Sequence, residues 1–225
     1  MDRVATFDAC GYAIESGALS DVECARLDAA VGSVDLQGAG TRELLNFEWA
    51  QRLARQLRDV PSISALLGTS RTAIQCTYFA KVASRNWLVA LHQDLSIPVA
   101  ERVADAPCKA WSEKEGGWFC QPPTAFLAQL VAVRVHFDDS TEANGPLRVV
   151  PGSHRLGRIA TSEVTQYRRS LGEVACVAPR RAAVAMRPLV LHASSKSITN
   201  AQRRVLHYVF GPTELPWGLR WRNAF

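Results

Sequence analysis

Two residues near the middle of the chain, His92 and Asp94, have the types and the spacing of paired metal ligands. Successive side chains of a β-strand alternate between its faces, so residues two positions apart point the same way. An imidazole and a carboxylate side by side can occupy two neighbouring positions on a first-row metal, and one histidine from another strand completes a facial triad. His192 ends the apolar run AVAMRPLVLH, where a strand would deliver it into the interior. This combination is typical of non-haem Fe(II) oxygenases.

The residues alone leave this interpretation open. A short His-x-Asp sequence occurs by chance in many chains, and a lone histidine at the end of an apolar run is more often a core residue than a ligand. The chain has five histidines. Of the others, we interpret His154 as structural, and for His207 a core or surface role competes with a role in a pocket.

From about Phe7 to Phe210 the chain resembles the phytanoyl-CoA dioxygenase family. The matching segments, in order, are FDACGYAIESGALS, YFAKVASRNWLVALHQDLSI, NGPLRVVPGSHR and HASSKSITNAQRRVLHYVF. The resemblance implies a double-stranded β-helix, or jelly roll, preceded by helices. It implies an enzyme that uses Fe(II), O2 and 2-oxoglutarate, with His92, Asp94 and His192 as the catalytic iron ligands.

The same resemblance implies residues for the cosubstrate. Arg203, eleven residues beyond His192, corresponds to the arginine that binds the distal carboxylate of 2-oxoglutarate, and Ser194 to a hydroxyl that bonds the same carboxylate. The chemistry agrees, because a guanidinium offers a bidentate fork to a carboxylate and a lysine does not. Arg203 begins the strand-like run RRVLHYVF, so the neighbouring Arg204 points to the opposite face. We expect Arg204 to be an ordinary surface charge.

Two further positions are weaker candidates for cosubstrate binding. Arg134 lies eleven residues before Gly145 of the NGP turn, where the family often has an aromatic residue, so this chain departs from the pattern. The alternation in VAVRVHF places Arg134 and His136 on one face. An arginine there could contact the cosubstrate, anchor a carboxylate or phosphate of the substrate, or face solvent. Thr77, four residues before Lys81, occupies the second such position.

The first part of the chain, residues 1–70, is predicted to be mainly helical support. Ser20 precedes a helix-like apolar stripe that ends near Gly32, as expected of a capped amphipathic helix. Residues 41–57 repeat the pattern, and residues 61–68 add a short turn of helix.

The remainder, residues 71–212, contains short β-rich runs separated by Gly, Pro, Asp and Asn. Many short strands with turn signals are typical of a sandwich, barrel or jelly roll. Residues 95–123 lack strong periodicity, so we interpret them as an insertion that flanks the entrance of the site. The chain is thus predicted to form one mainly β oxygenase domain, 1–225, with N-terminal helices and a cupin-like jelly-roll core.

Composition narrows the class of protein. Hydrophobic residues make up 48% and charged residues 21%, which suits a packed core. There is no signal-peptide pattern and no run near the ~18 apolar residues of a membrane span, so we expect a cytoplasmic protein that binds no membrane. The six cysteines lack a CxxC pair and are expected to be free thiols. The net charge of +5 is dispersed, which argues against nucleic-acid binding and favours anionic substrates.

The predicted function is oxidation of a small organic, anionic metabolite with Fe(II), O2 and 2-oxoglutarate, releasing succinate and CO2. Halogenating relatives have a small residue where this chain has Asp94, so the carboxylate favours hydroxylation. The alternatives are a cupin-type metal-dependent isomerase, a dioxygenase without cosubstrate, and a non-catalytic jelly roll that binds its ligand. The sequence leaves the substrate and the oligomeric state open.

Overall fold

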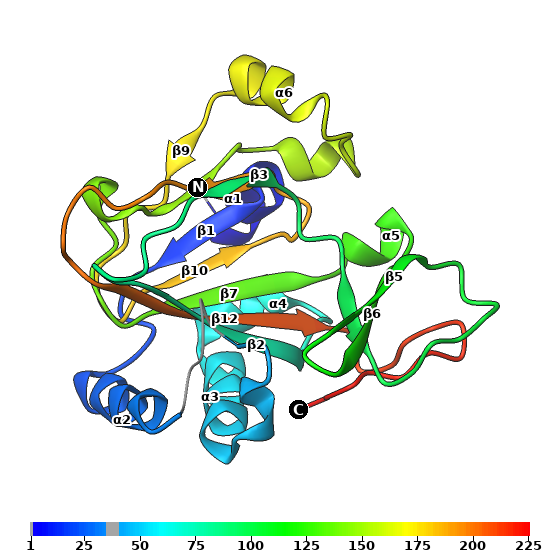
Figure 1. The fold of residues 1–225 in the computed structure, drawn as a ribbon, viewed down its shortest axis with the longest axis horizontal. Helices are drawn as coiled ribbons and strands as arrows, with labels where there is room; N and C mark the ends of the chain where they lie inside the picture. Colours follow the sequence, from blue (N-terminus) through cyan, green and yellow to red (C-terminus); the bar gives the residue numbers. More distant parts are fainter. Residues whose placement is uncertain (1, 35–40) are drawn as a thin grey trace.

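The computed structural model describes residues 2–34 and 41–225. Its two main sheets face each other as the halves of a jelly roll (Figure 1). The larger sheet has the antiparallel order β1 (Tyr12–Glu15), β10 (Ala183–Met186), β7 (Val131–His136), β12 (Arg203–Gly211) and β2 (Thr72–Lys81). The smaller has the order β3 (Val89–His92), β11 (His192–Ser194), β8 (Leu147–Val149) and β9 (Val174–Ala175). The predicted fold class, mainly β with N-terminal helices, is confirmed.

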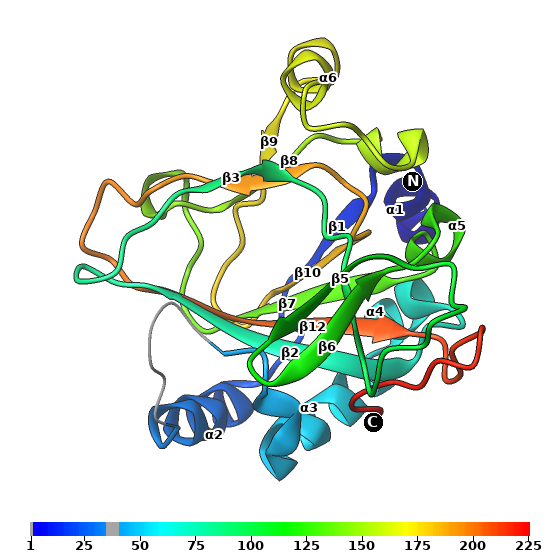
Figure 2. The same cartoon turned by 45° about the vertical axis from the view of Figure 1, so that its right-hand side comes forward.

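A third sheet crosses one open side of this sandwich (Figure 2). It consists of β4 (Ile97–Val99), β6 (Gly117–Gln121) and β5 (Lys109–Lys114). Residues 95–123, which we interpret as an insertion, thus contain regular strands that their lack of periodicity did not indicate. Ile97, Val99 and Phe119 are buried in it, whereas β5 is largely exposed and breaks the hydrophobic pattern that sequence reading depends on.

Helices cover the outer face of the larger sheet. Those in the N-terminal part are α1 (Arg3–Cys10), α2 (Asp21–Gly32), η1 (Leu44–Asn46), α3 (Glu48–Asp59) and α4 (Pro61–Leu67). The predicted cap of α2 is confirmed, because Ser20 and Glu23 form a reciprocal capping box. The second predicted helix begins later than expected, at Glu48. Sequence reading also missed β1, a four-residue strand that completes the edge of the larger sheet.

α3 shows why the helices belong on this face. Ala50, Leu53, Ala54 and Leu57 recur at the three- and four-residue spacing of one helical stripe, and all four are fully buried. They join the cluster that includes Leu206 on the outer face of β12. Each buried leucine contributes roughly 1.5–3 kcal/mol to stability. The inner face of the same sheet is left free for polar side chains.

The remaining helices lie outside this packing. They are α5 (Thr124–Leu127), η2 (Glu142–Asn144), η3 (Ser153–Leu156) and α6 (Val164–Leu171). α6 has no buried residue and projects from the smaller sheet beyond β9. All six cysteines are free thiols, as expected. In the described part of the chain, no helix is both long and apolar enough to cross a membrane.

Candidate active site

A cavity of about 440 Å³ lies between the two main sheets. His92 and His192 of the smaller sheet line the cavity, together with Asp94, which follows β3. The larger sheet lines it with Arg134 and Arg203. The third sheet forms another wall. Cavities of this size accommodate small organic ligands and are usually lined by apolar groups with a few polar ones among them. The predicted site residues thus converge on one space.

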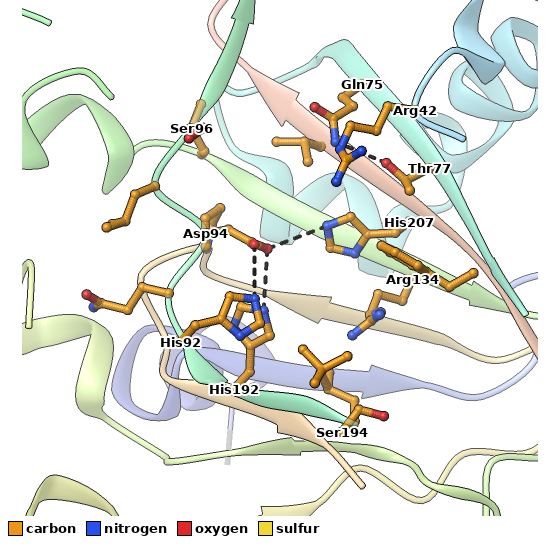
Figure 3. A pocket seen from close by; sticks show the side chains of 18 of the residues that line it. Arg42, Gln75, Thr77, His92, Asp94, Ser96, Arg134, His192, Ser194 and His207 are labelled. Carbon is orange, nitrogen blue, oxygen red and sulfur yellow. Dashed lines mark hydrogen bonds and ion pairs between the residues drawn. The ribbon is translucent and has the colours of Figure 1, made fainter. Parts of the chain in front are cut away.

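The three predicted metal ligands meet on one side of this cavity (Figure 3). The Nε2 atom of His92 lies 3.6 Å from Asp94 Oδ1, and Nε2 of His192 lies 3.5 Å from Oδ2 of the same carboxylate. One ligand atom from each residue falls within 4.8 Å of the other two. The histidines are brought together by the sheet, because His92 and His192 are direct partners in the β3–β11 ladder.

Hydrogen bonds orient both imidazoles toward the cavity. Nδ1 of His92 donates to the carbonyl of Ala90 at 2.8 Å, and Nδ1 of His192 donates to that of Val190 at 2.9 Å. With the proton on Nδ1, the lone pair of Nε2 is free for a metal. Burial lowers the pKa of His192 to about 4, so this ring is neutral at pH 7.

Asp94 reaches the histidines by a different route from the one predicted. β3 ends at His92, and the N–H of Asp94 donates to the carbonyl of Pro188 instead of continuing the ladder. Gln93 anchors this turn, since its amide donates to the carbonyls of Gly157 and Leu189. Strand alternation was therefore the wrong reason for the approach of His92 and Asp94.

The carboxyl group of Asp94 is held ionised by its neighbours. Burial opposes its ionisation, but His192 and His92 outweigh this effect and lower the pKa of Asp94. His207 also approaches it, with Nε2 3.8 Å from Oδ2. A negatively charged oxygen between two imidazoles is the donor set expected for a divalent first-row metal.

The inner face of the larger sheet forms the opposite wall. Thr77, His207 and Arg134 are direct neighbours across β2, β12 and β7, so they point to the same face. His207 and Arg134 are buried, and in the described part of the chain neither His207 Nδ1 nor Arg134 Nε has a hydrogen-bond partner. The alternative of a solvent-facing Arg134 is thus excluded, and His207, whose pocket role was the weaker alternative, lines the cavity.

Arg203 also lines the cavity. It is only 3% exposed, and its Nε has no hydrogen-bond partner among the residues that the structure describes. Arg204 points outward as expected, although it forms ion pairs with Asp138 and Asp28. Two hydrogen bonds from the Arg204 guanidinium bind Asp138.

Ser194 lies beside Arg203 but is already engaged. Its hydroxyl donates to the carbonyl of Gly145 at 2.9 Å and accepts from Nζ of Lys81 at 2.7 Å. Lys81 was not predicted as a site residue. Its one available signal was alternation, which places it on the same face of β2 as Thr77. His154 stays outside the cavity and contacts the carbonyl of Asp8, consistent with a structural role.

Comparison with known proteins agrees with the geometry of the site. The family model for phytanoyl-CoA dioxygenase matches residues 7–205. The chain belongs to this family. No curated protein matches the sequence.

Several solved structures share the fold of this phytanoyl-CoA dioxygenase family member. The epimerase SnoN, in complex with Fe3+, alpha ketoglutarate and nogalamycin RO, is 16% identical, with 96% of this chain and 90% of SnoN covered and a TM-score of 0.70. The carbocyclase SnoK from nogalamycin biosynthesis is 14% identical, with coverage of 94% and 83% and a TM-score of 0.67. EctD from S. alaskensis, with 2-oxoglutarate and 5-hydroxyectoine, is 17% identical, with coverage of 93% and 75% and a TM-score of 0.69. At these identities the likeness shows the fold alone.

Proposed function

We propose that this protein is an Fe(II)- and 2-oxoglutarate-dependent oxygenase that hydroxylates a small anionic organic molecule. The observation that carries the proposal is the convergence of His92, Asp94 and His192, with ligand atoms within 4.8 Å, in the same cavity as the buried Arg203. Membership of the phytanoyl-CoA dioxygenase family supports it. A cupin-type isomerase uses no 2-oxoglutarate, so it would not require the buried Arg203 in this cavity.

In this proposal each residue has a defined task. His92, Asp94 and His192 hold the metal on one side and leave the cavity side open. Arg203 binds the distal carboxylate of 2-oxoglutarate through its fork, and Ser194 and Thr77 flank it. Iron and 2-oxoglutarate together supply the activation of O2, with release of succinate and CO2. Because Asp94 occupies a ligand position with a carboxylate, hydroxylation is favoured over halogenation.

The metal assignment is tested by spectroscopy without turnover. Anaerobic Fe(II) and 2-oxoglutarate should give a visible charge-transfer band in the parent protein. His92→Ala and His192→Ala should each abolish the band, since two ligands alone hold Fe(II) weakly. His154→Ala is the matched control, because His154 lies outside the cavity, and it should keep the band. A band of parent intensity in either cavity variant would refute the assignment.

The type of reaction is a separate question, since SnoN is an epimerase and SnoK a carbocyclase. Mass spectrometry of the product made under 18O2 distinguishes the outcomes. A hydroxylase incorporates one labelled oxygen atom into its product. An epimerase leaves the substrate mass unchanged, and an oxidative ring closure lowers it by two hydrogens. Incorporation of label is the outcome that our proposal requires.

Arg134 supports an anionic substrate. It is buried in the cavity wall, and its guanidinium lies 5.5 Å from the Phe79 ring centre. Its Nε has no hydrogen-bond partner within residues 2–34 and 41–225. Two cations, Arg134 and Arg203, in one poorly solvated cavity repel each other unless anions neutralise them. The Asp94 carboxylate acts on Arg134, but in this proposal it holds the metal. The cosubstrate supplies one anionic group to Arg203. We infer that the substrate supplies the other as a carboxylate or phosphate.

This inference predicts that Arg134→Met affects two rates differently: the 2-oxoglutarate turnover stimulated by substrate, and the uncoupled turnover without substrate. Screening small carboxylates and phosphates for stimulation of 2-oxoglutarate turnover identifies compounds that the parent accepts. With such a compound, Arg134→Met should lose most of the stimulation yet keep the uncoupled rate, and Arg134→Lys should regain part of it. If both rates fall together, Arg134 contacts the cosubstrate instead. If neither falls, or if only neutral compounds stimulate the parent, the anionic anchor is wrong.

A further inference from the structure

Lys81 is a buried cation that the proposed function has not yet used. It ends β2 and is 1% exposed. Its Nζ donates to Ser194 Oγ at 2.7 Å and to the carbonyl of Ser195. Lys81 and Arg203 are direct partners in the β12–β2 ladder and therefore point to the same face. Arg203 and Ser194 thus line the cavity, and Lys81 contacts this part of its wall through the Ser194 hydroxyl.

Several elements pack against Lys81, and their charged groups are all positive. β12 contributes Arg203 and β7 contributes Arg134, and both lower the pKa of Lys81. His136 on β7 is neutral, because burial lowers its pKa to about 3. The Trp87 ring lies 5.7 Å from Nζ. Among residues 2–34 and 41–225, no carboxylate pairs with Lys81, whose polar partners are a hydroxyl and a carbonyl.

The turn at Gly145 packs tightly against Lys81 and the backbone of Ser195. Gly145 has a φ of 70°, and a Cβ there would lie 2.4 Å from the carbonyl oxygen of Ser195 and 3.0 Å from Nζ of Lys81. Its own carbonyl accepts the hydrogen bond from Ser194. Lys81 therefore fixes Ser194 from one side and the NGP turn fixes it from the other. A hydroxyl held between two partners is positioned before any ligand arrives.

We propose that Lys81 is a positioning residue of the cosubstrate site, which holds Ser194 beside Arg203 and binds a proton when the distal carboxylate enters. This inference rests on the proposed function, because it assumes that a dicarboxylate occupies the cavity. It adds to that function a coupling between cosubstrate binding and pH. A lysine with a purely structural role would keep the same charge whether or not the cosubstrate is bound.

The sign of the coupling follows from the surroundings. Burial, with Arg203 and Arg134, lowers the pKa of Lys81 to about 7 in the free protein. A carboxylate bound by Arg203 and Ser194 would lie one hydroxyl away from Lys81. A negative charge at that short range favours the charged form of the lysine and raises that pKa. At pH 8 most free molecules carry a neutral Lys81, so binding takes up a proton. At pH 6 the lysine is already charged and binding takes up none. Affinity for 2-oxoglutarate should therefore be constant below pH 7 and fall as pH rises above it.

Calorimetry of the Ni(II)-loaded protein tests this without turnover. 2-Oxoglutarate is titrated at pH 6 and pH 8, in two buffers of different ionisation enthalpy at each pH, so that the buffer dependence of the heat reports proton uptake. We expect nearly one proton at pH 8 and close to none at pH 6. Pyruvate, a keto acid without the distal carboxylate, should bind the metal with no uptake at either pH.

Variants identify the group that takes the proton. Lys81→Met should abolish uptake at pH 8 and weaken 2-oxoglutarate binding at pH 6 by about tenfold, the effect of losing a charge-assisted contact. Lys81→Arg stays charged, so it should bind with no uptake and with an affinity independent of pH. Lys109→Met, at an exposed position on β5, is the matched control and should behave as the parent.

The possible failures are distinct. If the Ni(II)-loaded parent does not bind 2-oxoglutarate, the proposed function fails. If it binds without proton uptake at pH 8, or if the uptake persists in Lys81→Met, the proposed function stands and the role of Lys81 is overturned. Where Lys81→Met does not fold, Lys81→Arg gives the same test, because uptake at pH 8 that persists in this variant overturns the role of Lys81.

Discussion

Arg203 and Arg204 are adjacent in sequence, yet their surroundings differ completely. Arg203 is buried in the cavity wall without a carboxylate partner in the described residues, whereas Arg204 binds Asp138 with two hydrogen bonds from its guanidinium. This Asp138 contact raises the pKa of Arg204, and burial with Arg134 lowers that of Arg203. The positive charge of Arg204 is thus neutralised by a carboxylate of the protein. In the proposed function, that of Arg203 is neutralised by the bound cosubstrate.

This contrast gives a matched pair of substitutions. Arg203→Lys keeps the charge but loses the bidentate fork, so the dissociation constant for 2-oxoglutarate should rise by about one to two orders of magnitude. Arg204→Lys should leave that constant unchanged and instead lower the melting temperature, because it weakens the contact with Asp138. Titration calorimetry and thermal melting measure the two effects. Similar affinities in the two variants would contradict the role of Arg203.

A site residue can be predicted from the sequence when its spacing from other site residues forms a recognisable pattern. The spacing of His92, Asp94 and His192, and of Arg203 beyond them, is a linear pattern that resemblance can detect. Lys81 and His207 have no such pattern. Their burial follows from the register between β2 and β12, which pairs residues more than a hundred positions apart. No local propensity carries that information.

Among the elements, the β5–β6 hairpin stands out because its tip is fastened to two distant segments. The carboxylate of Glu115 accepts hydrogen bonds from Thr41 and Arg42, and Arg222 donates to its backbone carbonyl. Burial opposes ionisation of Glu115, but these contacts with Arg42 and Thr41 outweigh it and lower its pKa. The contacts therefore stabilise the hairpin at neutral pH and weaken as pH falls through that lowered pKa.

Removing the charge at this tip should loosen one wall of the cavity. Glu115→Gln is expected to accelerate amide hydrogen exchange across residues 109–121, because the acceptors for Arg42 are weakened. The apparent KM for substrate should rise, since Phe119 and Gln121 of β6 line the cavity. Glu113→Gln, an exposed position on the same hairpin, is the control. Unchanged exchange in Glu115→Gln would show that strand pairing alone holds the hairpin.

The hairpin also marks where element prediction failed. The β-rich runs after residue 70 were recognisable because apolar and polar residues alternate in them or because, as in β10, they are apolar on both faces. β5 has neither pattern and is stabilised by pairing with β6. β1 was missed for a similar reason, since four residues between two helices form a strand only because β10 pairs with them.

For the whole molecule, the position of the positive charge matters more than its amount. Of the 26 lysines and arginines, Lys81, Arg134 and Arg203 are buried. Arg134 and Arg203 line the cavity, and Lys81 contacts Ser194 in its wall. Part of the positive charge behind the net charge of +5 therefore lies in the interior, where it can attract an anionic ligand. The larger sheet separates this polar interior from an apolar layer under the N-terminal helices. Composition could indicate a preference for anions but could not say that the anions bind inside.

The ladder step that joins His92 to His192 also determines when the site can exist during folding. The two histidines lie a hundred positions apart in the sequence, so bringing them together requires closure of a long loop, with the loss of chain entropy that this entails. During synthesis, a nascent chain lacks the second histidine until most of its length has been made. Iron then binds only molecules whose sheets are complete, and stabilises them over all others. The fraction of molecules that hold metal thus reports the fraction that has folded completely.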